Sequence, residues 1–135
     1  MKRVIVTGGA SFIGSAFVWK LNREGIEDVL VLDQLRDGDK WKNFVGLKYG
    51  DTLQKDVFLR QLLDGSLAFL PDAVVHMGAC SSTTERDADY LMENNFRFTR
   101  TLAEWAVAPG VRFLCASRAA TYGDGEHGFS DATEL

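Results

Sequence analysis

The sequence of 135 residues lacks the features that would place it in several special classes of protein. Its two cysteines, Cys80 and Cys115, show neither C-x-x-C spacing nor the spacing of metal ligands. We therefore expect reduced thiols in a cytoplasmic protein, and no metal site. Lys and Arg form no block of like charge, and the net charge of -4 gives no electrostatic reason to expect a nucleic-acid partner.

Membrane features are missing as well. No apolar run approaches the length of a membrane span, and the apolar run after the basic residues 2–3 is too short for a signal peptide. Repeats, low-complexity stretches and linkers are also absent. A hydrophobic content of 46% and a charged content of 25% are ordinary for a globular chain. We expect a single domain over residues 1–135 and no membrane partner.

The clearest local signal is the stretch Val4–Ser15, which reads V-I-V-T-G-G-A-S-F-I-G-S. Its β-branched residues precede two glycines, and apolar residues then return at helical spacing. This order predicts a buried strand, a tight turn and a helix N-terminus, where backbone N–H groups and the helix dipole favour a pyrophosphate. Gly8 and Gly14 bracket the turn, with Ser11 where a middle glycine is usual. The alternative is a strand–helix turn that binds nothing.

Strand and helix patterns alternate along the rest of the chain. Continuous apolar runs, typical of strands buried on both faces, are followed by segments with helical spacing. This alternation predicts an α/β fold with a doubly wound parallel sheet, Rossmann-like, of about five strands with helices on both faces. We expect strands at 4–7, 29–32, 47–51, 73–77 and 111–116, helices at 12–25, 54–63 and 87–108, and a short helical turn at 42–45.

Small and polar residues follow the predicted strands, at the edge where such sheets bind ligands. T-G-G at 7–9 follows the first strand, residues 76–82 span the end of the fourth, and residues 116–117 close the fifth. Asp33 closes the second strand about 20 residues beyond Gly14, where an acidic residue accepts hydrogen bonds from the ribose hydroxyls of a dinucleotide. A solvated turn aspartate is the alternative interpretation.

The charge of Asp33 also bears on the choice of dinucleotide. It would repel the 2′-phosphate of NADP unless cations offset it. Arg36, Lys40 and Lys55 are near enough in the sequence to do so, and the pattern therefore does not decide between NAD and NADP. The two asparagines at 94–95 lie on the long predicted helix. Their amides either face the cofactor or satisfy buried backbone groups, and both interpretations stay open.

Several of these segments together resemble the extended short-chain dehydrogenase/reductase family. The resemblance lies in T-G-G-A-S-F-I-G at 7–14, Asp33, H-M-G-A-C at 76–80 and A-A-T-Y-G at 119–123. Within that family, L-R-D-G-D-K-W at 35–41 and G-A-C-S-S-T-T-E at 78–85 are similar to nucleotide-sugar epimerases, and the octet is the most specific signal. The resemblance covers the whole chain but only the amino-terminal half of such an enzyme. The carboxy-terminal substrate domain is therefore expected to be absent.

The resemblance implies a tightly held NADP, with NAD as the alternative. It also implies inversion at C6 of the heptose in a nucleotide-activated sugar such as ADP-heptose, a step toward lipopolysaccharide. A carbinol C–H is not acidic, so its hydride is passed to the nicotinamide and returned to the other face of the resulting ketone. We also expect a homo-oligomer. The positions that match cofactor contacts are Gly8, Ser11, Phe12, Ile13, Gly14, Asp33, Gln34, Lys40, Lys55, Met77, Gly78, Ala79, Cys80, Ser81 and Asn94, and those on the substrate side are Ser82, Thr83 and Thr84.

The chain departs from the family in its catalytic residues. The family's base is a tyrosine followed four positions later by lysine, whereas the residues four positions after the three tyrosines here are Leu53, Asn94 and Glu126. The segment after the fifth strand reads S-R-A-A-T-Y-G, with Arg118 where the family has a serine that bonds the reacting oxygen, and with Ser117 and Thr121 nearby. No catalytic set is complete, so we expect the chain alone to lack turnover.

Two functions stay open from the sequence. The chain is either the NAD(P)-binding, amino-terminal part of a nucleotide-sugar epimerase or a free-standing dinucleotide-binding module without catalysis. If the chain is truncated, its five strands leave one edge of the sheet unpaired where later strands would add. We therefore expect self-association or marginal stability.

Overall fold

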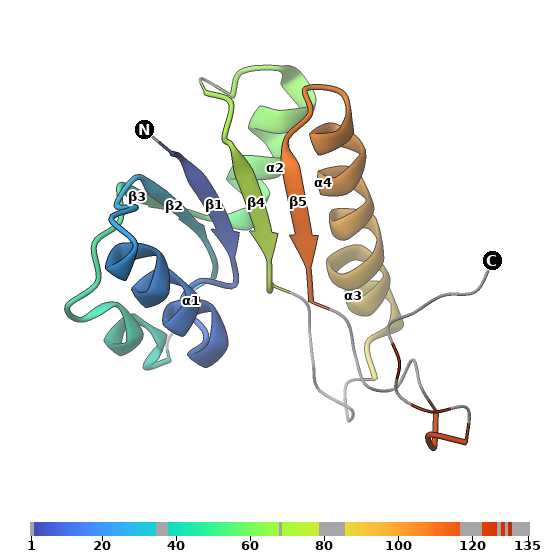
Figure 1. The fold of residues 1–135 in the computed structure, drawn as a ribbon. Coiled ribbons are helices and arrows are strands. Elements are labelled where there is room, and N and C mark those ends of the chain that lie inside the picture. Colours follow the sequence, from blue (N-terminus) through green and yellow to red (C-terminus); the bar gives the residue numbers. More distant parts are fainter. Residues whose placement is uncertain are drawn as a thin grey trace.

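A computed structural model describes residues 2–34, 38–67, 69–78, 86–116, 123–126, 128 and 130. Its strands form one parallel sheet in the order β3-β2-β1-β4-β5, and helices lie on both faces of this sheet (Figure 1). The strands are β1 (Val4–Thr7), β2 (Val29–Leu32), β3 (Asp51–Leu53), β4 (Ala73–His76) and β5 (Arg112–Cys115). The helical elements are α1 (Phe12–Arg23), η1 (Lys40–Phe44), α2 (Lys55–Asp64), α3 (Ala88–Leu91), η2 (Met92–Arg97) and α4 (Phe98–Val107).

The order of the strands confirms the predicted doubly wound sheet. The chain places β2 and β3 on one side of β1 and then returns to place β4 and β5 on the other side. The direction of winding therefore reverses between β1 and β4. In parallel sheets, a ligand crevice opens beyond the carboxyl ends of the strands at such a switch point.

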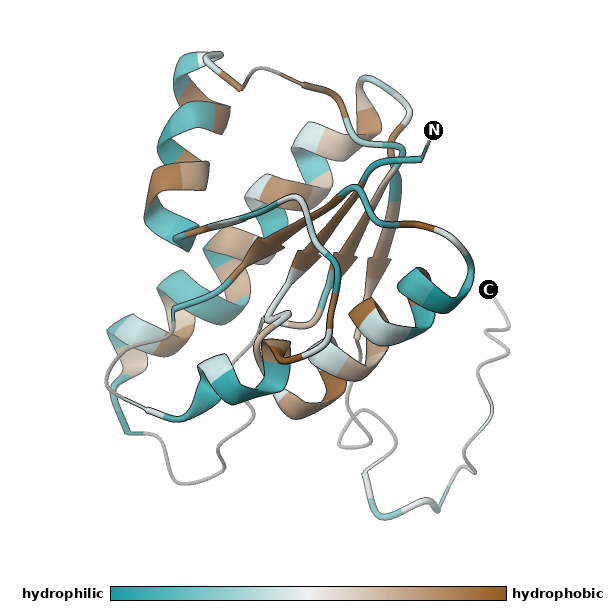
Figure 2. Cartoon of the chain, turned by 90° about the vertical axis from the view of Figure 1, so that its left-hand side faces the viewer, coloured by the Kyte–Doolittle hydropathy of each residue, from teal (hydrophilic) through white to brown (hydrophobic). Residues whose placement is uncertain are grey.

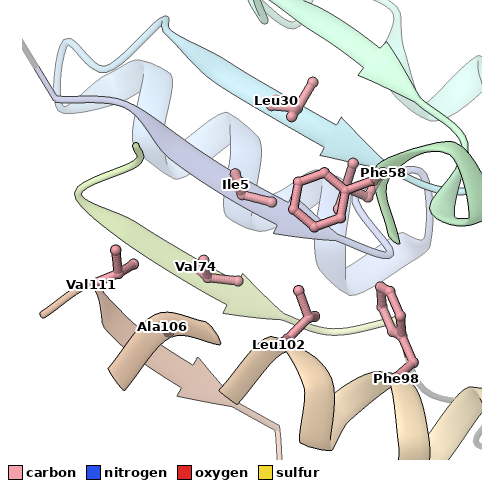
Figure 3. Packing of buried hydrophobic residues seen from close by; sticks show 9 residues of the cluster. Ile5, Leu30, Phe58, Val74, Phe98, Leu102, Ala106 and Val111 are labelled. Atoms are coloured by element: carbon pink, nitrogen blue, oxygen red, sulfur yellow. The ribbon is translucent and has the colours of Figure 1, made fainter. Parts of the chain in front are cut away.

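The three central strands, β1, β2 and β4, are apolar because side chains on both of their faces are buried. In β1, Ile5 packs toward α2 and α4, together with Phe58 and Leu102 (Figure 3). Its neighbours Val4 and Val6 pack on the opposite face, in a second cluster that includes Val18 of α1. Figure 2 shows the contrast in composition, since the central strands are hydrophobic along most of their length while the helices alternate between hydrophobic and hydrophilic residues.

The third strand lies later than its sequence pattern indicated. It was expected at 47–51, but β3 spans Asp51–Leu53 and shares only Asp51 with that range. The backbone N–H of Leu47 instead bonds to the carbonyl of Phe44, 3.0 Å away, in a turn that follows η1. Leu47 packs against the cluster under α1, so its apolar character reflects burial in a turn rather than a place in the sheet.

The longest predicted helix, 87–108, contains a change of helical geometry. Asp87 caps its start by accepting the backbone N–H of Tyr90 at 3.0 Å. After α3 the backbone widens into the π-helix η2 over Met92–Arg97 and then continues as α4. Residue spacing alone predicts one regular helix, because a single wide turn leaves the apolar pattern on either side intact. Such π-bulges concentrate at functional sites.

No helix in the described ranges is both long enough and apolar enough to cross a membrane.

We expect truncation of a buried side chain of α4 to cost far more stability than truncation of an exposed one. Leu102 is fully buried, so Leu102→Ala should lower the free energy of unfolding by about 2–5 kcal/mol. Val107 on the same helix is 78% exposed, and Val107→Ala should change it by less than about 0.5 kcal/mol. Urea denaturation of both variants measures the difference, and similar losses for the two would contradict this packing.

Candidate functional site

The carboxyl ends of the three central strands meet at one level of the sheet. The pairing register sets Thr7 of β1 beside Leu32 of β2 and beside His76 of β4. A pocket opens immediately beyond these residues. It is lined by Thr7, Gly8, Leu32, Asp33, Gln34, Lys55, Gly78, Asn94 and Phe98.

The glycine turn after β1 closes too tightly for side chains at its two ends. A Cβ on Gly14 would lie 2.0 Å from the carbonyl oxygen of Gly8, and a Cβ on Gly8 would lie 2.8 Å from the backbone of Met77 and Gly78. Gly8 also has a φ of +69°, which side-chain-bearing residues rarely adopt. The spacing from Gly8 to Gly14 is therefore what brings α1 against β1, and β1 against the segment after β4.

Ser11 stands where a middle glycine is usual and takes a structural role in the turn. Its hydroxyl donates to the carbonyl of Gly8 at 2.6 Å and accepts the N–H of Gly14 at 3.2 Å. Ser11 is thus the N-cap of α1. The first turn of α1 contains no acidic residue, while Lys20 and Arg23 lie in its last turn. The positive end of the helix dipole is left available to an anion.

Phe12 and Ile13 begin α1 with their side chains 84% and 64% exposed. They cover no core, and the pocket next to them is lined instead by the turn and by the ends of the strands. Exposure at this position suits contact with a bound molecule that lies across the helix N-terminus. Their contact with a cofactor stays a prediction.

Asp33 connects the glycine turn to the loop after β2. Its Oδ2 accepts the N–H of Ala10 at 2.9 Å, and its Oδ1 accepts the N–H of Gln34 at 2.7 Å and Lys40 Nζ at 3.0 Å. A carboxylate has about four acceptor positions. Among the described residues, these contacts fill three of those positions, which leaves one on Oδ2 for a ribose hydroxyl. The solvated turn aspartate is not what the structure shows, because the side chain of Asp33 is only 10% exposed.

Asn43 of η1 is a part of this arrangement that the sequence pattern did not indicate. Its side-chain amide donates to the carbonyl of Ala10 at 2.7 Å. Ala10 is therefore held on both sides, since its N–H goes to Asp33 and its carbonyl to Asn43. An asparagine in a short helical turn is ordinary in sequence. Only the tertiary contact distinguishes it.

The far wall of the pocket comes from α2 and η2. Lys55 Nζ donates to Oδ1 of Asn94, whose Nδ2 lies 3.0 Å from Asn95 Oδ1 and 3.4 Å from the carbonyl of Gly78. Asn94 is buried and also lines the pocket. The two interpretations of this amide therefore both hold, because it satisfies a backbone carbonyl and faces the cleft.

The structure brings most of the described candidates together. Asp33, Gln34, Lys55, Gly78 and Asn94 line one pocket with Gly8, and Lys40 is joined to it through Asp33. Met77 differs, because its side chain packs against the apolar cluster under α1. The remaining candidates lie outside the described residues: Ala79, Cys80, Ser81, Ser82, Thr83, Thr84, Ser117, Arg118 and Thr121.

His76, the last residue of β4, is buried directly behind the pocket. Its Nδ1 contacts the hydroxyl of Thr7, and its Nε2 lies 2.7 Å from the hydroxyl of Thr99 on α4. Burial, with a smaller contribution from the positive charge of Lys55, lowers the pKa of His76 from 6.5 to about 4. The imidazole is therefore neutral at physiological pH. Thr99 has no signal in the sequence beyond its place on a helix.

The low pKa of His76 predicts an acid-dependent loss of stability. Above pH 6.5 the imidazole is neutral in both the folded and the unfolded chain, and its contribution is fully present. Below that pH the imidazole of the unfolded chain becomes protonated, whereas that of the folded chain stays neutral until about pH 4. The free energy of unfolding should therefore fall by roughly 1.4 kcal/mol per pH unit across this window.

Urea denaturation at several pH values, with His76→Gln as the reference, measures this slope. The other histidine, His127, is present in both proteins, so its effect cancels. NMR titration of the wild-type imidazole provides a check that needs no variant. A midpoint near 6.5 would contradict the prediction.

Comparisons with known proteins agree with this arrangement. The model of the NAD dependent epimerase/dehydratase family matches residues 4–135. The chain is 61% identical over 127 residues to the ADP-L-glycero-D-manno-heptose-6-epimerase of Nitratidesulfovibrio vulgaris (strain DP4), covering 94% of this chain and 39% of that protein. It is 51% identical over 128 residues to the enzyme of the same name from Fusobacterium nucleatum, covering 95% and 39%. The chain thus spans about two fifths of the length of these curated relatives.

Solved structures are similar over the same region. The Helicobacter pylori ADP-L-glycero-D-manno-heptose-6-epimerase superposes with a TM-score of 0.76 at 26% identity, covering 99% of this chain and 43% of that one. The Bordetella bronchiseptica enzyme WbmG, solved in complex with NAD, gives a TM-score of 0.73 at 25% identity, covering 92% and 40%. The glycine turn, Asp33 and the parallel sheet are thus accounted for together: the chain belongs to the NAD dependent epimerase/dehydratase family.

Proposed function

We propose that this chain is the dinucleotide-binding part of an ADP-L-glycero-D-manno-heptose-6-epimerase, one that inverts C6 of the heptose of a nucleotide-activated sugar. The observation that carries the proposal is the cleft at the switch point between β1 and β4. There a turn too tight for a Cβ at Gly8 or Gly14 meets the dipole end of α1 and the carboxylate of Asp33. Its two curated relatives at 61% and 51% identity, both named as this epimerase, support the same assignment.

The chemistry of the residues that line the cleft suits a nicotinamide dinucleotide. The helix start carries no acidic side chain that would compete with a pyrophosphate. Oδ2 of Asp33 retains an acceptor position for a ribose hydroxyl. When bound, such a cofactor supplies the hydride acceptor and donor that inversion at a carbinol requires, because the carbinol C–H is not acidic. The amides and hydroxyls of the cleft then bind and orient it.

NADP is the cofactor that the charges around Asp33 favour. Lys40 Nζ lies 3.0 Å from Asp33 Oδ1, with a side chain that is still 47% exposed. This cation offsets the carboxylate that would otherwise repel a 2′-phosphate, and it can reach such a phosphate from solvent. Lys55 brings a second positive charge to the pocket.

The proposal also includes a location in the cytoplasm and association of the chain with another copy. Cys115 is a free, exposed thiol, as expected in a reducing compartment. β5 lies at an edge of the sheet among the described strands, and Leu114 on it is 48% exposed. An exposed edge strand that carries apolar side chains favours association with another copy or another domain.

Lys40→Ala should weaken NADP binding about tenfold, because the cation that would pair with the 2′-phosphate is lost. NAD binding should change less than about threefold, since NAD carries no phosphate there. Lys42→Ala is the matched control, because Lys42 lies on the same turn and pairs with Asp39 instead. Calorimetric titration with each dinucleotide measures both affinities. Equal losses for NADP and NAD would overturn the assignment of Lys40 to the 2′-phosphate.

The 135-residue chain should bind the dinucleotide without interconverting the two ADP-heptose epimers. It contains no tyrosine–lysine pair at the family's spacing, and Arg118 occupies the place of the family's serine. Incubation of the purified chain with cofactor and either epimer, followed by chromatography, tests this expectation. Turnover without another chain would contradict it, and the absence of any affinity for NAD or NADP would overturn the proposed function itself.

A further inference from the structure

The buried imidazole of His76 bonds through both of its nitrogens, although it does not line the cleft. Nδ1 contacts the hydroxyl of Thr7 on β1, and Nε2 contacts the hydroxyl of Thr99 on α4. The ring packs against Phe98, with ring centroids 5.6 Å apart, and stacks on Phe113 at 6.3 Å. Every side of the imidazole is thus fixed, and its two polar atoms join three elements of the fold.

The contacts of the Thr7 hydroxyl decide which nitrogen carries the proton. This oxygen accepts the N–H of Gly78 at 3.0 Å and that of Met77 at 3.2 Å. The N–H of Met77 also bonds to the backbone carbonyl of Thr7, at 3.1 Å. A hydroxyl has two acceptor positions and one hydrogen to donate. Both acceptor positions of Thr7 are therefore in use, and its hydrogen goes to His76 Nδ1. Nε2 must then carry the imidazole proton and donate it to Thr99.

The opposite tautomer would not match the donors and acceptors around the Thr7 hydroxyl. If Nδ1 carried the proton, that hydrogen and the N–H hydrogens of Met77 and Gly78 would all point at the Thr7 oxygen. The hydroxyl hydrogen of Thr7 would then have no acceptor on His76. A protonated imidazole would place the same surplus hydrogen there. The geometry is self-consistent only for the neutral ring with its proton on Nε2, and a low pKa for His76 agrees with this.

The Thr7 hydroxyl in turn sets where the segment after β4 begins. It holds two consecutive backbone N–H groups, those of Met77 and Gly78. Gly78 lines the cleft and packs so closely that a Cβ on it would lie 2.9 Å from Thr7 Oγ1 and 3.2 Å from the nitrogen of Gly8. A rotation that turned the hydroxyl hydrogen of Thr7 toward the N–H groups of Met77 and Gly78 would therefore remove their acceptor and weaken the hold on this wall of the cleft.

We propose that His76 is a positioning residue for the dinucleotide cleft: as the neutral Nε2–H tautomer, held by Thr99, it orients the Thr7 hydroxyl that fixes Met77 and Gly78. This inference rests on the proposed role of the cleft as the dinucleotide site. It assigns a task to Thr99, which has no contact with the cleft itself, and it makes the tautomer of one buried ring a determinant of affinity.

The tautomer can be read directly in the wild-type chain. Nitrogen-15 NMR of the labelled imidazole at about pH 7 should show Nε2 bearing the proton and Nδ1 as an unprotonated acceptor. This measurement needs neither a variant nor a cofactor. A proton on Nδ1 would overturn the proposal.

Thr99→Val tests whether the orientation matters for binding. It removes the acceptor of the Nε2 proton while keeping the branched shape of the side chain. We expect NADP and NAD to bind about fivefold more weakly, with an altered Nδ1 resonance in the free chain. Thr99→Ser restores a hydroxyl and should bring both the affinity and the resonance back to within about twofold of the wild type. Thr101→Val makes the same substitution on the same helix away from His76, and should leave both unchanged.

The outcomes separate this inference from the proposed function. A Thr99→Val variant that is folded and less stable but binds the dinucleotide as tightly as wild type would show a structural role only, and would overturn the inference. So would a failure of Thr99→Ser to restore affinity. A wild-type chain that binds neither NAD nor NADP would overturn the proposed function, while the nitrogen-15 spectrum would still decide the tautomer.

Discussion

The close approach of two backbones, at Gly8 after β1 and at Gly78 after β4, is the constraint on which the rest of the cleft depends. The parallel register sets Thr7 beside His76, so the residues that follow them leave the sheet at the same level. A Cβ on either glycine would come within 3 Å of the other segment. The absence of two side chains thus lets β1 and β4 end side by side and leaves room beyond them for the glycine turn, α1 and the pocket.

The sequence was sufficient to predict the fold and the centre of the cleft because both follow from local patterns. Apolar runs identified the buried strands, and the spacing of Gly8, Gly14 and Asp33 identified a strand, a turn and an acidic residue at the edge of the sheet. The third strand was placed too early because Leu47 is apolar for a different reason, packing in a turn under α1. Periodicity records which residues are buried, and it does not record whether the burial occurs in a strand.

Residues that act through tertiary contacts could not be predicted in this way. Asn43 and Thr99 are ordinary residues on helical segments, and only the folded chain brings one to Ala10 and the other to His76. The π-helix η2 is hidden for a related reason, since it changes the backbone without disturbing the apolar pattern around it. The wide turn is nevertheless where Asn94 meets both Lys55 and Gly78, so a local irregularity of the helix supplies one wall of the cleft.

The double hold on Ala10 has a thermodynamic consequence. The same residue, Ala10, bonds through its N–H to Asp33, at the end of β2, and through its carbonyl to Asn43, in η1. Ordering of either segment therefore reduces the conformational entropy that remains to be lost when the other becomes ordered. A molecule that contacts the glycine turn and a molecule that contacts η1 would each lower the cost of binding the other. A single ligand long enough to contact both would gain from this coupling, because the entropy of ordering Ala10 is lost only once.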